Sequence, residues 1–471
     1  MSARTRRSRR PVVLVLAGAV LMVTAVVVAV AGTGGGQTPV TFPCGVRACR
    51  TGQTPVPLRA FESAYVAADP RSPDHVVVTD ADLLATRCAW HTSFDGGKHW
   101  IDGRFELPAG YSGCRIDPPS GGHVPNGSVG IGSGGRVYAV FGSASGADPG
   151  RESVMLAIST DGGRTFGPAA VAVAPPGAGL GLARLLMTVV ARPAGPGGAS
   201  RDILLVSTWE CHVTPAGTAC DQALFSRSDD AGATFSAPVV VNQPPGGQNP
   251  SQPAMGADGT IYVLFQRRFS NGPVDLLLAR SSDNGVTFTE SKVDTEQAIG
   301  VAYDPAKLVV DPKNGALCAA WSDSRVGSQQ IFFRMSKDQG RTWAQATLLS
   351  PDPNYTGSSR SPSMDIAADG RIDVAYYHTS PGTPNFDDVY LDSSTDGGAN
   401  FAVVQVNSKP VDRSLGYSGP AGSLGEVGNY YPPAVSSLDS VAYVAWSDTA
   451  NATPLTHTQD VRVRTIPFAA R

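Results

Sequence analysis

The clearest pattern along the chain is a short apolar strand followed by a polar turn of nearly constant composition. Segments such as 154–158 and 331–335 are rich in apolar residues, and their length and flanking turns predict strands. Strands of this kind precede an eight-residue segment of the form Ser-x-Asp-x-Gly-x-x-(Trp or Phe). The segment occurs six times, beginning at Ser93, Ser159, Ser228, Ser281, Ser336 and Ser394.

The spacing of these segments indicates a repeat architecture. Their aspartates are Asp95, Asp161, Asp230, Asp283, Asp338 and Asp396, and successive aspartates lie 53 to 69 residues apart. Near-regular spacing of this size is typical of stacked supersecondary units. Within each segment the Asp carboxylate can accept backbone N–H bonds, and the Gly can adopt a left-handed backbone conformation. We interpret the segments as turns that fasten two strands, with the terminal aromatic ring packed against the sheet beneath, rather than as ligand or metal sites.

A second tight turn recurs upstream in the units, for example at Gly134-Gly135 and Asp369-Gly370, and an apolar strand follows it. Each unit therefore has the order strand, tight turn, strand, loop, strand, Ser-x-Asp turn, strand. This order predicts a four-stranded antiparallel meander, which is the blade of a β-propeller.

The C-terminal region supplies one further unit without a Ser-x-Asp turn. Residues 431–436, 441–446 and 460–466 can form three strands, and the segment around residues 39–42 can add the fourth. Such a strand would close the ring between the two ends of the chain. We therefore predict an all-β, seven-bladed propeller over residues 55–471, with 36–54 as a linker that contains the candidate closing strand. Six blades plus an extra hairpin is the alternative.

The N-terminus predicts export. Five arginines, at positions 4, 6, 7, 9 and 10, precede an apolar run over residues 12–31, which is long enough for a helix that spans a bilayer. Residues 1–35 are therefore either a basic stub with a membrane anchor or a signal peptide cleaved near Ala31. In both cases the propeller would lie outside the cytoplasm, secreted or attached to the cell membrane.

Cysteine usage and net charge narrow the function classes further. Cys44/Cys49, Cys88/Cys114 and Cys211/Cys220 are sequence neighbours and predict disulfides in an oxidising compartment, whereas Cys318 lies in an apolar run and is expected to be buried. The net charge of -3 excludes the basic footprint of a nucleic-acid-binding protein. No Cys/His spacing resembles a zinc site, so no metal or cofactor is predicted. A monomer is expected.

The predicted topology also separates two faces of the ring. The tight turns and the Ser-x-Asp turns share one face, which we call the turn face. The loops between second and third strands and the connections between blades share the other, which we call the loop face. Longer and more polar segments favour the loop face as the place of a binding site.

Six segments of the form Ser-x-Asp-x-Gly-x-x-aromatic on such a meander resemble the Asp boxes, or BNR repeats, of the sialidase (neuraminidase) superfamily. The resemblance covers roughly residues 55–471, and its motif is specific for the fold rather than for an activity. It implies three arginines that hold a sugar carboxylate, a tyrosine nucleophile paired with a glutamate, and an aspartate as acid/base.

Carried over by position, the resemblance implies Tyr431 as nucleophile, Asp82 (or Asp80) as acid/base, and Glu426 as a substitute for the family's glutamate, because Gln252 stands at the usual glutamate position. The implied substrate-binding residues are Arg59, Arg267, Arg360, Gln252 and Tyr430. A neutral amide at Gln252 cannot help to deprotonate a phenol. Three hypotheses follow: a surface propeller that binds a glycan or sugar acid, an exo-sialidase-type glycoside hydrolase, and an extracellular scaffold for protein partners.

Overall fold

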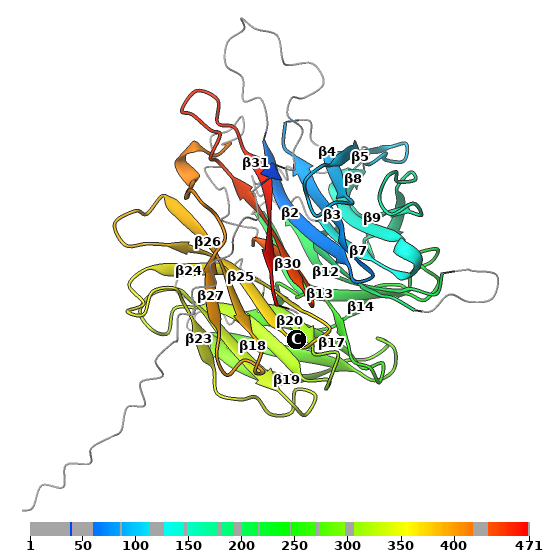
Figure 1. Ribbon diagram of the computed structural model, residues 1–471. Helices are drawn as coiled ribbons and strands as arrows, with labels where there is room; N and C mark the ends of the chain where they lie inside the picture. The colour runs from blue at the N-terminus through cyan, green and yellow to red at the C-terminus, as the bar shows by residue number, and fades with distance from the viewer. Residues whose placement is uncertain are drawn as a thin grey trace, which may run out of the picture.

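The computed structural model describes residues 38–39, 60–84, 87–113, 127–145, 148–177, 180–192, 200–214, 217–244, 246–268, 273–296, 306–417 and 432–469. These residues form seven antiparallel sheets of four or five strands, arranged as the blades of a propeller (Figure 1). The seven-bladed prediction is therefore confirmed, and six blades are excluded.

The first three blades run from residue 61 to residue 240. Their strands are β2 (Phe61–Asp69), β3 (Ser72–Asp82), β4 (Arg87–Ser93) and β5 (Ile101–Arg104) in blade 1; β6 (Tyr111–Ser112), β7 (Gly127–Ile131), β8 (Val137–Ser145), β9 (Asp148–Ser159) and β10 (Ala170–Val173) in blade 2; and β11 (Leu180–Val190), β12 (Ile203–Thr214), β13 (Gly217–Ser228) and β14 (Val239–Val240) in blade 3.

The next three blades continue to residue 412. Their strands are β15 (Gly247–Gln248), β16 (Ala254–Met255), β17 (Ile261–Arg268), β18 (Val274–Ser281) and β19 (Thr289–Glu296) in blade 4; β20 (Lys307–Val310), β21 (Leu317–Asp323), β22 (Gln330–Ser336) and β23 (Thr347–Leu349) in blade 5; and β24 (Ser358–Ile366), β25 (Ile372–Thr379), β26 (Phe386–Ser394), β27 (Ala402–Gln405) and β28 (Val411–Asp412) in blade 6.

Blade 7 combines the two ends of the chain. It contains β29 (Ala434–Leu438), β30 (Val441–Asp448), β31 (Asp460–Pro467) and the N-terminal strand β1 (Thr38–Pro39), which pairs antiparallel with β31. Figure 1 shows the red strands of blade 7 beside the blue strands of blade 1. A shared apolar cluster, which includes Val76, Val78 and Tyr443, joins these two blades. The ring is thus closed by both strand pairing and packing.

The hydrophobic core is divided among the interfaces between blades. Each of the seven interfaces has its own cluster of buried apolar side chains. Trp321 contributes to the cluster between blades 4 and 5, and Trp446 to the cluster between blades 6 and 7; both are fully buried. Because a sheet in this arrangement is covered on both faces, its strands are apolar on both sides over much of their length.

The six Ser-x-Asp turns share one set of hydrogen bonds. In the turn of blade 5, Ser336 Oγ donates to Asp338 Oδ1 (2.8 Å) and accepts the N–H of Gly340 (2.8 Å), while Thr342 N–H donates to Asp338 Oδ1 (2.8 Å). The same carboxylate accepts a bond from Thr342 Oγ1, and together these bonds lower the pKa of Asp338 to about 2. The turns connect the third and fourth strands of their blades, as predicted.

The aromatic ring that ends a turn packs on the preceding blade as well as on its own. Phe401 of blade 6 lies 5.3 Å from Phe333 of blade 5, and Phe288 of blade 4 lies 5.5 Å from Phe225 of blade 3 (centroid distances). Gly398 approaches so closely that an added Cβ would lie 2.3 Å from the Phe333 ring. Each such turn therefore fastens two blades, which goes beyond the predicted packing on the sheet beneath.

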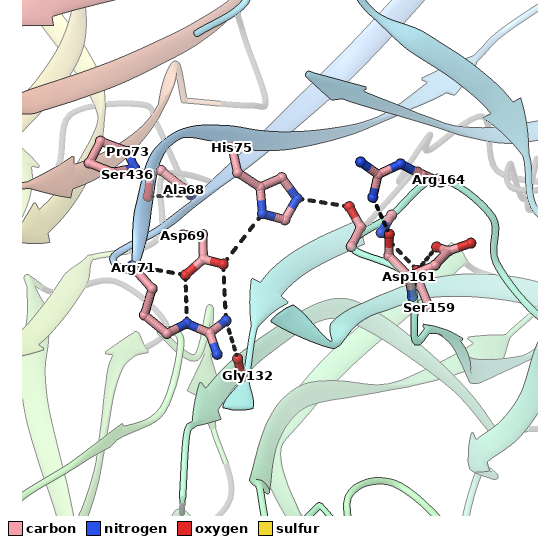
Figure 2. A network of polar contacts seen from close by, with 12 residues as sticks. Ala68, Asp69, Arg71, Pro73, His75, Gly132, Ser159, Asp161, Arg164 and Ser436 are labelled. Carbon is pink, nitrogen blue, oxygen red and sulfur yellow. Dashed lines mark hydrogen bonds and ion pairs between the residues drawn. The ribbon is translucent and has the colours of Figure 1, made fainter. Parts of the chain in front are cut away.

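Charged side chains reinforce the turn face between blades 1 and 2 (Figure 2). Arg71 donates to both oxygens of Asp69 (2.9 and 3.0 Å) and to the carbonyl of Gly132 in blade 2 (3.0 Å). His75 bridges Asp69 Oδ2 (3.4 Å) and the carbonyl oxygen of Gly162 (2.8 Å). The network therefore ties the first tight turn of blade 1 to two turns of blade 2.

A second network of this kind joins blades 6 and 7. The fully buried Arg371 forms an ion pair with Asp373 (3.0 Å) and donates to the carbonyls of Leu438 and Asp439 (2.8 Å each). Ser437 of blade 7 donates to the same Asp373 carboxylate (2.7 Å).

The cysteines agree with the predicted pairing where the structure describes both partners. Cys211 and Cys220 form a disulfide between β12 and β13. Cys88 is disulfide-bonded, and Cys44, Cys49 and Cys114 lie outside the described residues. Cys318 is free and buried, and burial raises the pKa of its thiol to about 12. Among the described residues, no helix is long and apolar enough to cross a membrane.

Candidate functional site

The strand topology places the predicted site residues on the loop face. Second strands end there and third strands begin there, so the side chains near residues 82, 267, 323, 379 and 448 belong to one rim. Several predicted members fall outside the described residues. These are Arg59, Glu426, Tyr430 and Tyr431.

Asp82, the predicted acid/base, lies buried at the end of β3 in blade 1. Its Oδ2 accepts a hydrogen bond from the Arg104 guanidinium (2.8 Å), and its Oδ1 accepts the N–H of Leu84 (3.1 Å). Asp82 lies on the side of β3 that also presents Val76 and Val78 to blade 7. The carboxylate is thus held within blade 1 by a charged partner and a backbone donor.

A second buried row lies beside Asp82. His91 Nε2 contacts Asp80 Oδ2 (3.1 Å), and His91 Nδ1 contacts Asp102 Oδ1 (2.6 Å). Burial lowers the pKa of the imidazole, but the charges and hydrogen bonds of Asp80 and Asp102 outweigh it and raise the pKa to about 9. His91 is therefore a cation at neutral pH, enclosed between two carboxylates. The alternation of Asp80 and Asp82 indicates a polar row, but only the strand register shows that His91 and Asp102 complete it.

Arg360, at the start of β24 in blade 6, is held by a carboxylate of its own blade. Its guanidinium pairs with both oxygens of Asp387, by Nη1 to Oδ1 at 3.0 Å and by Nη2 to Oδ2 at 2.5 Å. Thr379 Oγ1 bonds both groups. Asp387 is fully buried and also forms an ion pair with Arg413 (3.0 Å). Sequence reasoning missed Asp387 and Arg413, because neither lies in a recognisable motif.

Arg267 and Gln252 belong to blade 4 and make different contacts. Arg267 Nη2 pairs with Glu290 Oε1 (2.8 Å) on the outer strand β19. Gln252 Nε2 donates to the carbonyl of Met187 (2.7 Å) on β11 of blade 3. The amide at the position of the family's glutamate is thus engaged by the backbone of the neighbouring blade.

The described members of the predicted set lie on different blades and make their hydrogen bonds and ion pairs to other residues. Asp82 lies in blade 1, Arg267 and Gln252 in blade 4, and Arg360 in blade 6. Each contacts a different partner, and both arginines are already paired with carboxylates.

Exposed apolar side chains distinguish the loop face from the turn face. Among the described residues, five of the eight exposed large hydrophobic residues lie on the loop face; these are Leu84, Val326, Tyr355, Phe386 and Leu455. They belong to blade 5, the connection to blade 6, and blades 6, 7 and 1, which are consecutive around the ring. Val286 is the one exposed large hydrophobic residue within a described Ser-x-Asp turn.

Two of these residues are aromatic; Phe386 lies in blade 6 and Tyr355 lies in the connection that leads into it. Phe386 (42% exposed) begins β26 and pairs with Asp412, the residue before Arg413. Arg413 also donates to the carbonyls of Asn385 and Pro384, next to Phe386. Tyr355 (40% exposed) lies in the connection that leads into blade 6, where its carbonyl accepts the Ser328 hydroxyl.

Comparison with solved structures supports the architecture. A protein of unknown function from Dyadobacter fermentans aligns with a TM-score of 0.52 at 14% identity, over 78% of this chain and 97% of that chain. A PL25 ulvan lyase bound to -[GlcA(1-4)Rha3S]- aligns with a TM-score of 0.50 at 12% identity, over 92% of this chain and 96% of that chain. A Hadza microbial sialidase aligns with a TM-score of 0.45 at 14% identity, over 85% and 75%.

At these identities the similarity concerns the fold. No protein-family model matches the sequence, and no curated protein matches it.

Proposed function

We propose that this protein is an exported β-propeller that binds extracellular carbohydrate on its loop face, and that its six Ser-x-Asp turns are Asp boxes of the BNR type. The main support is the row of exposed apolar side chains over blades 5, 6, 7 and 1. These side chains share the face with buried ion pairs such as Arg360–Asp387 and Asp82–Arg104.

This combination suits sugars for a physical reason. A sugar ring presents an apolar C–H face and a rim of hydroxyl groups. Exposed aromatic rings such as Phe386 and Tyr355 offer a flat apolar surface on which the C–H face of a sugar can stack. The Arg104 side chain, which is 32% exposed and held in place by Asp82, offers hydrogen bonds to the hydroxyl rim with little loss of side-chain entropy on binding. Because the ulvan lyase binds -[GlcA(1-4)Rha3S]-, acidic polysaccharides belong in the first panel of sugars to be tested.

The contacts of the described candidates favour binding over sialidase-type hydrolysis. Arg267 and Arg360 are engaged by Glu290 and Asp387, and the Gln252 amide is engaged by the Met187 carbonyl. An arginine that already pairs with a protein carboxylate must exchange this partner before it can hold a substrate carboxylate. Release of sugar from a fluorogenic sialoside, lost in Tyr431→Phe, would favour the hydrolase instead.

We also propose that residues 12–31 remain attached as a membrane anchor. The apolar run of 20 residues is longer than the core of an ordinary signal peptide and matches the hydrocarbon thickness of a bilayer. Mass spectrometry of the N-terminus of the exported protein tests this point, since a chain that begins near Gly32 would contradict it.

The binding proposal is tested with the full chain in nanodiscs on neutral and acidic glycans. Phe386→Ala and Tyr355→Ala are each expected to weaken binding about tenfold, the loss of roughly one stacking contact. Val286→Ala on the turn face is the matched control, because Val286 is 66% exposed and distant from the loop face in the topology. Unchanged affinity in the Phe386→Ala, Tyr355→Ala double variant would contradict the proposed face. Capture of a stoichiometric protein partner, with no affinity for sugars, would support the scaffold hypothesis.

A further inference from the structure

The direction of the closing strand shows from which face the N-terminal segment enters the ring. In the antiparallel pair β1–β31, Thr38 lies opposite Val463 and Pro39 opposite Arg462. Strand β31 runs from Asp460, opposite the end of β30 on the loop face, to Pro467, opposite the start of β30 on the turn face. From residue 38 to 39 the chain therefore moves toward the loop face. At Thr38 the strand therefore points back toward the turn face in the N-terminal direction.

From this direction we infer that the turn face of the propeller lies against the membrane and that the loop face points away from the lipid. The inference rests on the proposed membrane anchor, and it adds which surface the lipid contacts. Its partner is the bilayer surface just outside the end of the apolar run at Ala31.

The length of the connection between the apolar run and β1 limits how far blade 7 can lie from the membrane. Six residues, 32–37, separate Ala31 from Thr38, so the seven virtual bonds between these residues reach at most about 25 Å. The turn-face end of β31 at Pro467 lies four residues from Val463, which is about 13 Å along the strand. About 12 Å then remains between the edge of blade 7 and the membrane. The turn-face edge of blade 7 is therefore held close to the lipid headgroups.

The opposite orientation, with the loop face against the membrane, would require a connection longer than residues 32–37 can provide. To bring the loop face to the membrane, the chain before Thr38 would have to reverse its direction, and a tight turn takes about four residues. The two or three residues left span only about 10 Å. Asp460 is itself three residues, about 10 Å, from Val463, and the 11-residue loop 449–459 continues beyond the end of the strand (Figure 1). The connection is therefore too short to pass the loop face.

This orientation agrees with the chemistry of the two faces. The turn face is occupied by contacts within the ring, such as Arg71 to Gly132 and Arg371 to Asp439. The loop face, with its exposed Phe386 and Leu455, would be open to polymers approaching from outside. A bound glycan chain would not have to pass between the protein and the lipid.

Two single-cysteine variants on blade 7 test the orientation. Ser440→Cys lies in the exposed turn between β29 and β30 on the turn face, and Leu455→Cys lies in the exposed loop between β30 and β31 on the loop face. The strands between them contain eight residues, so the labels differ in height by about 26 Å while sharing one blade. Cys318 is buried and Cys211–Cys220 is bonded; labelling of the wild-type chain measures any remaining background.

The full chain is labelled with a donor dye and reconstituted in vesicles that contain acceptor-labelled headgroups. Energy transfer is expected to be at least about twofold more efficient from the dye in the Ser440→Cys variant than from the dye in the Leu455→Cys variant, given the height difference. Equal or reversed efficiencies would overturn the inference, as would an exported chain that lacks the apolar run.

An insertion variant checks that the short connection is the cause. About twenty Gly/Ser residues placed between Gly34 and Gly35 should lengthen the tether and narrow the difference between the two labels. If the difference in energy-transfer efficiency between the two labels is unchanged in the insertion variant, the short connection is not what orients the propeller. Glycan binding is measured in the same vesicles. If the two labels still differ in energy transfer but no glycan binds, the proposed function is contradicted and the inferred orientation is not.

Discussion

The turn face and the loop face use arginine in different ways. On the turn face, Arg371 bonds Asp373 of its own blade and two carbonyls of blade 7, so its charge joins two blades. On the loop face, Arg360 and Arg267 pair with Asp387 and Glu290 of their own blades. Arg325 is an exception there, because it also contacts Asp294 of blade 4. The charge of Arg371 thus joins two blades, whereas Arg360 and Arg267 pair with carboxylates of their own blades.

The last glycine of the Ser-x-Asp turns and the exposed apolar residues show a similar difference. Gly398 of the last Ser-x-Asp turn packs against Phe333 of blade 5, while Gly382 in a loop of blade 6 has nothing within 4 Å of an added Cβ. The loop face leaves Phe386 and Leu455 exposed. Exposed side chains such as these, which are not buried in the contacts between blades, are free to vary and to bind ligands.

The largest expected effect is on the arginine network between blades 6 and 7. Arg371→Ala should lower the free energy of unfolding by about 3–5 kcal/mol, because it leaves the buried Asp373 without its ion pair. Arg71→Ala is the matched control: Arg71 occupies the corresponding turn of blade 1, but its side chain is 46% exposed, so a loss of about 1 kcal/mol or less is expected. Urea titrations measure both. Equal losses of unfolding free energy in the two variants would contradict the idea that the buried charge of Arg371 stabilises the contact between blades 6 and 7.

The next effect separates close packing from backbone strain. Gly398→Ala should cost about 2–3 kcal/mol, because its φ of +80° disfavours a side chain and the added Cβ meets the Phe333 ring at 2.3 Å. Gly382→Ala has the same strain at φ +81° but open space, so about 1 kcal/mol is expected. Thermal unfolding of the two variants gives the difference. A larger loss in Gly382→Ala would contradict packing between blades as the role of the turn glycine.

Two carboxylate-linked groups, His91 inside blade 1 and Asp161 in the Ser-x-Asp turn of blade 2, should respond to pH with opposite sign. The raised pKa of His91, about 9, means that its contribution to stability is full below about pH 6.5 and is lost as the pH rises through 9, amounting to about 3 kcal/mol. Burial opposes a low pKa for Asp161, but hydrogen bonds from Thr165 and Ser159 outweigh it and lower the pKa to about 2. The contribution of Asp161 is therefore present above about pH 4 and is lost as the pH falls through 2.

Melting temperatures measured from about pH 2 to about pH 10 show both predicted losses of stability, and a variant of Asp102 tests the loss at high pH. In Asp102→Asn the loss should begin at lower pH, because one of the two carboxylates that raise the pKa of His91 is removed. An NMR titration of the His91 ring provides a direct measurement. The assignment fails if wild type and variant lose stability over the same pH range.

The smallest expected effect tests a single turn. Ser336→Ala removes the acceptor of the Gly340 N–H and the donor to Asp338, which should cost about 1–2 kcal/mol. Ser380→Ala, at an exposed loop-face serine, is expected to change stability by less than about 0.5 kcal/mol. Urea titration resolves the two. A neutral Ser336→Ala would show that the shared hydrogen bonds contribute little to the turns.

Part of the candidate site could be predicted from the sequence, and part could not. The positions of Asp82, Arg267 and Arg360 at strand ends followed from the repeat. Their partners did not, because Asp387 is 27 residues from Arg360, Glu290 is 23 from Arg267, and Arg104 is 22 from Asp82. The alignment of these pairs depends on the register of strands that are not neighbours in sequence.

The order of strands within the blades and the chemistry of the six turns follow from the amino-acid sequence alone, whereas the folded ring was needed to decide between seven blades and six. These features depend on contacts within about ten residues, such as Ser336 to Gly340, so a local pattern is enough to specify them. The folded ring was needed to show which blade each aromatic ring and arginine contacts, that His91 is enclosed by Asp80 and Asp102, and from which face the chain enters blade 7. Those features exist only after the ring has closed, because closure brings the two ends of the chain together and sets the neighbours of every blade.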